Sequence, residues 1–218
     1  MAVWTIASQE GTAGERIAAE LAASAGVPLL DRHALMLCAR ELDPTLPLDD
    51  DVVERVGGRL QAMALSLAIT TGDADVVNEI RLRQALPQIG RTVLARAASS
   101  PCVIHAPGAF AALSEHASAI HVRVRAPLEW RIAAYRRQQL VDRHAAVKAL
   151  KHDDHLTQAW VRSLYRVDID DASLFSLVVD ASRFSTERLV ETLLAAGGGS
   201  PETSKAGQAT RLAASTAP

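Results

Sequence analysis

The fold is decided by residues 3–16, VWTIASQEGTAGER, in which a short apolar run leads into a glycine-containing turn. The apolar residues Val3–Ala7 are typical of a buried strand bounded by turn residues. A helix is predicted from Glu15 to about Ala25, because apolar residues recur there on one face, and Gly26 suits its end. A second apolar run, Val27–Leu30, follows. This order predicts a βαβ unit and therefore a parallel sheet.

In the rest of the chain, short apolar runs alternate with segments that have the apolar periodicity of helices. Residues 31 to about 99 read as helical, interrupted by a proline-containing loop. Three further strands are predicted at Pro101–His105, Ala119–Val124 and Phe175–Asp180, with helices from near Leu128, over about Arg143–Arg166 and over Ser185–Ala195. About five strands in a helix-rich chain indicate a three-layer α/β/α architecture.

Composition narrows the classes of partner. The net charge of −2 favours neither nucleic acid nor an anionic membrane as the main partner. The N-terminus lacks the features of a signal peptide, and the longest apolar run, Leu60–Ile69, is too short to span a bilayer. We therefore expect a cytoplasmic protein, in which Cys38 and Cys102 are reduced and buried.

The turn after the first strand suits a phosphate group. Gly11 and Gly14 allow the backbone to bring its N–H groups and a helix N-terminus toward an anion. The turn is neither a dinucleotide fingerprint, which needs a third glycine, nor a Walker A motif, because Gly14 and Glu15 stand where Lys and Ser or Thr are required. On spacing alone, an ordinary tight turn is an equal alternative.

Five segments, taken together and in order, resemble the cytidylate kinase-like family of bacterial proteins related to nucleoside monophosphate kinases. The first, Ile6–Ile17, follows the family frame I-S-R-x-x-G-S-G-G-R-x-I. The others are Gly26–Arg32, Cys102–Ile104 with Gly108-Ala109, His121–Arg131, and Asp154, Tyr165 and Asp168 with Leu174–Asp180.

The resemblance implies a P-loop kinase fold with a five-stranded parallel sheet in the order 2-3-1-4-5. It also implies that ATP with Mg²⁺ is held at the loop after the first strand, and that an acceptor nucleotide lies near Asp31. On this basis the kinase-like domain covers residues 1–196, with a helical acceptor-side insertion at about 32–99 and a lid-like basic segment at about 136–166. The Gly-, Ser- and Thr-rich residues 197–218 are expected to be a disordered tail.

Several positively charged positions of the family pattern are changed here. Glu15 stands where the loop arginine is expected, Ala106-Pro107 replaces a Gly-Arg pair, and Thr157 ends a D-x-x-R pattern that begins at Asp154. Phosphoryl transfer depends on positioning and on neutralising phosphate charge. The losses therefore favour weak activity or none.

Candidate site residues follow from the loop, the resemblance and the basic stretch between Arg123 and Arg166. The candidate catalytic side chains are Arg16, Arg131 and Arg137. The nucleotide would be bound by the loop residues Gly11, Thr12, Ala13, Gly14, Glu15 and Arg16. The acceptor would be bound by Asp31 and Arg32, and the lid would use Arg136 and Arg143. Each basic residue could instead lie on a solvated helical face. No resident metal site is predicted, since His152 and His155 lack a third ligand.

Three functions remain open at this point. The first is a nucleotide-binding kinase that transfers the γ-phosphate of ATP to a nucleoside monophosphate such as CMP or to another small acceptor. Its expected partner is a nucleotide or a small phosphorylated molecule. The second is a weakened relative that binds nucleotide as a regulatory or protein-interaction module. The third is a structural homodimer with a closed loop. Nucleic acid and membrane are not expected as partners.

Overall fold

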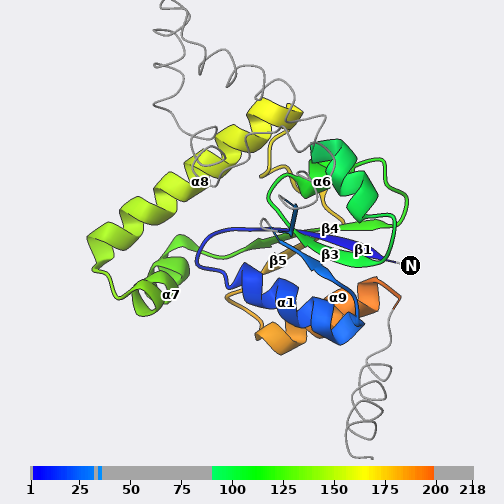
Figure 1. The fold of residues 1–218 in the computed structure, drawn as a ribbon. Coiled ribbons are helices and arrows are strands. Elements are labelled where there is room, and N and C mark those ends of the chain that lie inside the picture. Colours follow the sequence, from blue (N-terminus) through cyan, green and yellow to red (C-terminus); the bar gives the residue numbers. More distant parts are fainter. Residues whose placement is uncertain (1, 32–33, 36–89, 199–218) are drawn as a thin grey trace, which may run out of the picture.

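Five parallel strands form the centre of the computed structural model, which describes residues 2–31, 34–35 and 90–198. The strands lie in the order β2-β3-β1-β4-β5, so the predicted order is confirmed (Figure 1). Their bounds are β1 Val3–Ser8, β2 Leu29–Leu30, β3 Cys102–His105, β4 Ala119–Arg125 and β5 Leu177–Asp180. Because all strands run the same way, their carboxyl ends share one edge of the sheet.

Helices cover both faces of the sheet, as the three-layer prediction requires (Figure 1). Their bounds are α1 Gly14–Ala25, α6 Ala109–Ala112, α7 Leu128–Gln139, α8 Arg143–Tyr165 and α9 Thr186–Ala196. Residues 90–97 are also helical, and η1, a short 3-10 helix, spans Ala172–Leu174. The α7–α8 pair projects beyond the sheet beside the loop that follows β1 (Figure 1).

Strand β1 is buried on both faces because its side chains alternate between two cores. Trp4 and Ile6 pack with α1 and α9 in a cluster that includes Leu21 and Leu193. On the opposite face, Ala7 packs with Phe110 of α6 and Val161 of α8. Both clusters are built mainly from aliphatic side chains, which follows from the small aromatic fraction of 4%.

Most predicted boundaries agree with the structure to within a few residues. Gly26 has a φ of 68° and ends α1 as predicted, and the Ser185 hydroxyl accepts from the N–H of Arg188 at the start of α9. The last strand begins at Leu177 rather than Phe175. Phe175 instead closes η1 by donating its N–H to the Ala172 carbonyl, and its ring packs on Phe110 with centroids 4.4 Å apart.

Some predictions concern residues outside the described part of the chain. These are most of the helical insertion at 32–99, including Arg32 and Cys38, and the tail from residue 199 onward. Cys102 is a buried free thiol, as predicted, and burial raises its pKa to about 11. Across residues 2–31, 34–35 and 90–198, none of the helices combines the length and apolar character needed to cross a membrane.

Candidate functional site

The shape of the loop between β1 and α1 is set by two positive φ angles, a backbone hydrogen bond to β4 and a side-chain hydrogen bond within the loop. Gly11 has a φ of 81°, and Ala13 has a φ of 57° although it is not a glycine. The Gln9 N–H donates to the carbonyl of Val124 at 2.9 Å, which ties the loop to the end of β4. The buried Thr12 hydroxyl donates to the Gln9 carbonyl at 2.5 Å. The Thr12 hydroxyl therefore braces the loop.

Both loop glycines occupy positions that exclude a larger residue. A Cβ on Gly14 would lie 2.1 Å from the Ser8 hydroxyl oxygen, which leaves no room for a side chain. A Cβ on Gly11 would lie 3.1 Å from the Arg131 carbonyl oxygen, and the positive φ would strain it further. The backbone of α7 thus packs directly on the loop. These close contacts explain why both positions require glycine, which the spacing of the two glycines in the sequence did not explain.

Ser8 and His105 meet at the carboxyl edge of the sheet, a pairing that sequence reasoning did not find. Their Oγ and Nε2 atoms are 2.9 Å apart, because parallel pairing of β1 with β3 brings the two strand ends together. Burial lowers the pKa of His105, and the opposing effect of Glu15 and Asp31 is smaller. The imidazole is therefore biased toward its neutral form beside the loop.

Arg131 is the predicted catalytic side chain that the structure brings to the loop. Its two terminal nitrogens bind the Asp154 carboxylate at 2.9 and 2.7 Å, and Nη1 also donates to the Glu10 carbonyl at 3.3 Å. The residue is only 4% exposed, and its Nε is buried without a hydrogen-bond partner in the described structure. Arg131 therefore links α7, α8 and the loop, and its charge is already paired.

The other predicted arginines contact helices rather than the loop. Arg16 lies on the surface between Glu20, 3.1 Å away, and the Thr186 hydroxyl of α9, 2.8 Å away. Arg143 forms an exposed bidentate pair with Glu129 at 2.7 and 2.9 Å, which joins α8 to α7. Arg137 donates to the Ala133 carbonyl, one turn back in α7, and Arg136 is exposed on the same helix.

Acidic groups gather near the loop. Burial raises the pKa of Glu10, and the neighbouring carboxylates of Asp153 and Glu15 raise it further. Burial likewise raises the pKa of Asp153, with a contribution from Asp154. Asp31, after β2, is exposed and accepts from the N–H of Ala34 at 2.9 Å. The described surroundings of the loop are therefore richer in negative charge than a phosphate site requires.

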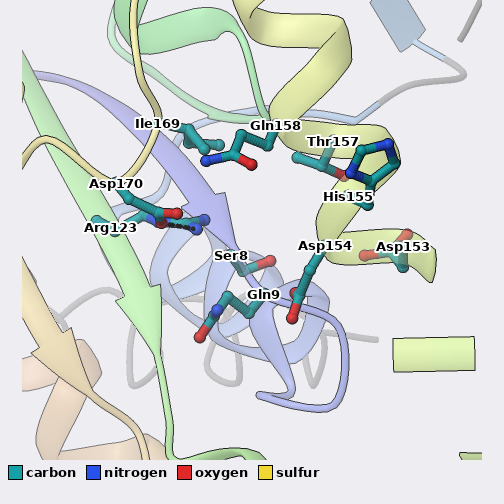
Figure 2. A pocket seen from close by; sticks show the side chains of 10 residues that line it. All are labelled: Ser8, Gln9, Arg123, Asp153, Asp154, His155, Thr157, Gln158, Ile169 and Asp170. Carbon is teal, nitrogen blue, oxygen red and sulfur yellow. Dashed lines mark hydrogen bonds and ion pairs between the residues drawn. The ribbon is translucent and has the colours of Figure 1, made fainter. Parts of the chain in front are cut away.

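A cavity of about 230 Å³ lies between the loop, β4 and α8. Figure 2 shows Arg123 and Asp170, joined at 3.1 Å, on one side of it and the α8 side chains on the other. Its lining residues are Ser8, Gln9, Arg123, Asp153, Asp154, His155, Thr157, Gln158, Ile169 and Asp170. Sequence reasoning noted Arg123 only as the start of a basic stretch; the available signal was an arginine between two valines of a predicted strand.

Comparison with known proteins agrees with the fold and with the five matching segments. The sequence pattern of the cytidylate kinase-like family matches residues 3–183. No curated protein matches the sequence.

Among solved structures, an uncharacterized protein from Eubacterium ventriosum ATCC 27560 is similar with a TM-score of 0.62 at 13% identity, covering 90% of this chain and 98% of that chain. TT1252 from Thermus thermophilus has a TM-score of 0.48 at 20% identity, covering 89% and 95%. A gluconokinase from Sinorhizobium meliloti 1021 has a TM-score of 0.48 at 12% identity, covering 99% and 98%. At 13% identity, the likeness to the protein from Eubacterium ventriosum ATCC 27560 concerns the fold alone.

Proposed function

The chain belongs to the cytidylate kinase-like family, and from that premise we propose that it binds ATP at the loop of residues 8–16. The observation that carries this proposal is the shape of the loop. Gly11 and Ala13 adopt positive φ angles, and Gly14 begins α1 where no side chain fits. Such a turn at a helix N-terminus directs backbone N–H groups toward an anion.

Mg²⁺ would accompany the nucleotide at this loop. Glu15, in the first turn of α1, is exposed and supplies the oxygen ligands that Mg²⁺ prefers. The Thr12 hydroxyl is less suited, since the residue is buried and its side chain is held against the Gln9 carbonyl. When bound, the ion neutralises phosphate charge, and in this chain Glu15 would hold it with the phosphates completing its coordination.

Transfer of the γ-phosphate to a nucleoside monophosphate such as CMP is proposed to be slow. The transition state of phosphoryl transfer is stabilised by cations placed around the moving phosphate. Arg131, which lies at the loop, is bound to Asp154, and Arg16 is bound to residues of α1 and α9. Binding should therefore be a stronger property of this protein than turnover.

A nucleotide-binding regulatory module without transfer is the second candidate. The observation that favours it is the Arg131–Asp154 pair, since it neutralises the buried cation at the loop and joins the loop to α8. In that function, occupation of the loop would be signalled through α7 and α8 to a protein partner.

The test is thermal unfolding of the full chain with Mg-ATP, with CMP and with both, followed by a coupled assay for ADP. Mg-ATP at 100 times its dissociation constant should stabilise the protein by about 2.7 kcal/mol. ADP release that depends on CMP identifies the kinase, and stabilisation without ADP identifies the regulator. No stabilisation by any nucleotide would defeat both.

The loop itself is tested by Gly14→Val. The added side chain would collide with Ser8, so stabilisation by Mg-ATP should be lost while the unliganded protein still unfolds cooperatively. Ala13→Gly is the matched control, because glycine keeps the positive φ and should retain binding. Undiminished binding by Gly14→Val would place the nucleotide elsewhere.

A further inference from the structure

The cavity beside the loop is lined by carboxylates, and its lining arginine is already paired. Asp153, Asp154 and Asp170 face it, whereas Arg123 is its one lining arginine. Arg123 binds Asp170 at 3.1 Å and donates to the Ala7 carbonyl at 3.4 Å. Within the described residues, a phosphate placed here would meet acidic groups and no unpaired arginine. Two like charges about 4 Å apart repel by about 4 kcal/mol near a protein surface.

The remaining lining groups suit hydroxyl groups. Ser8, Gln9, Thr157 and Gln158 both donate and accept hydrogen bonds, and the carboxylates accept. A sugar hydroxyl also donates and accepts, so it can pair with every member of this set. Ile169 is the one apolar side chain of the described lining, which contains no Phe, Tyr or Trp. Its one aromatic ring is the imidazole of His155, which can also donate or accept a hydrogen bond.

Arg123 shows that the cavity is built around a buried polar group. The residue is 6% exposed, lies on β4 between Val122 and Val124 of the core, and has a buried Nε with no hydrogen-bond partner in the described structure. Burying a charged group is costly unless its hydrogen bonds are made. A partly satisfied arginine in the wall of a cavity points to a ligand that completes the network.

We propose that this cavity binds a polyhydroxylated molecule that carries no phosphate group, of the size of a monosaccharide or nucleoside. The inference rests on the proposed function, since the cavity adjoins the loop that would hold the nucleotide. Discrimination comes from repulsion by Asp153, the one lining carboxylate without an ion pair in the described structure. Its charge disfavours a phosphorylated ligand more than it favours an uncharged one. The weak transfer to CMP proposed above follows from the same charge.

Calorimetric titration of the full chain tests the proposal with two matched pairs, D-ribose with ribose 5-phosphate and cytidine with CMP. Titrations are made at low salt and at pH 8, where an ordinary histidine is neutral, with and without Mg-ATP. We expect the uncharged member of at least one pair to bind at least fivefold more tightly than its phosphorylated partner, with and without Mg-ATP.

Two variants locate the effect. Asp153 lines the cavity and makes no ion pair within the described residues. Asp153→Asn should therefore raise the affinity for the phosphorylated member about fivefold. The affinity for the uncharged member should change less than twofold. Thr157→Val removes one hydroxyl of the lining at constant shape and should weaken the uncharged member severalfold. Glu191→Gln, on α9 across the sheet, is the control and should change neither affinity.

Each outcome decides something. Tighter binding of the phosphorylated member in both pairs, or no binding of any of the four probes while Mg-ATP binds, would overturn this inference and leave the proposed function standing. Tighter binding of an uncharged probe without any binding of Mg-ATP would overturn the proposed function and leave the cavity's ligand class intact. If Asp153→Asn leaves the ratio of the two affinities unchanged, repulsion by the Asp153 carboxylate is not the cause of the preference.

Discussion

At the scale of single residues, the Arg131–Asp154 pair controls the charge of the site. The two residues are 23 positions apart in sequence, and their side chains form two hydrogen bonds across α7 and α8. Sequence reasoning placed Arg131 in catalysis and noted Asp154 as the start of an incomplete lid pattern. It could not pair them, because the pairing depends on the angle at which the two helices meet.

Replacing Asp154 with Asn should destabilise the protein by about 2 kcal/mol, as measured by urea unfolding. Loss of one partner leaves Arg131 charged and buried, and this cost is about 3–5 kcal/mol for fully buried pairs. It is smaller here because the Asp154 side chain is 32% exposed.

Glu129→Gln is the matched control, since it breaks the bidentate pair with Arg143 at the surface of the same two helices. That pair is exposed and screened by solvent, so the unfolding midpoint should not move. Equal changes in the free energy of unfolding for the two substitutions would show that the Arg131–Asp154 pair contributes no more to stability than the exposed pair.

At the scale of elements, the turn between α7 and α8 carries backbone strain. Leu140 ends α7 with a φ of 56° and is 90% exposed. Glycine is the residue that adopts this conformation without cost. This turn lies within the predicted lid segment of residues 136–166, so its stability bears on the placement of α8 over the cavity.

Leu140→Gly should stabilise the protein by about 1 kcal/mol, because it relieves the left-handed strain and removes little packing. The free energy of unfolding from urea titration is the measurement. Leu140→Ala is the control, as alanine keeps the strain and should give no gain. Stabilisation by both variants would assign the effect to surface hydrophobicity instead.

At the scale of the whole molecule, the two ends of the described fold are joined through one buried side chain. The indole N–H of Trp4, on β1, donates to the Leu193 carbonyl of α9 at 3.0 Å. Gly197 leaves room for the ring, since a Cβ there would lie 2.1 Å from it. The strand that precedes the loop is thus held in place by the last helix.

Trp4→Phe should cost at least about 1 kcal/mol of stability, from the lost buried hydrogen bond and the smaller ring. Thermal unfolding followed by circular dichroism measures the change. The less buried Trp130, whose indole makes no hydrogen bond in the described structure, is the comparison: Trp130→Phe should cost less. The reverse order would mean that α9 does not hold β1.

The architecture could be predicted because its signals are local. An apolar run, a glycine turn and an amphipathic helix specify a βαβ unit without reference to distant residues, and the family resemblance supplied the strand order that the structure confirms. The starts of the second and fifth strands were less accurate, because short strands depend on their neighbours for hydrogen bonds.

By itself, the sequence determined the class of fold, the loop at residues 8–16 and the loss of expected positive charge around it. Only the tertiary structure decided which charges meet. Strand register brought Ser8 to His105, helix packing bound Arg131 to Asp154, and Arg123 was buried against Asp170 to form the cavity wall. The physical reason is that secondary structure follows short-range patterns, whereas electrostatic pairing depends on distances between segments far apart in the chain.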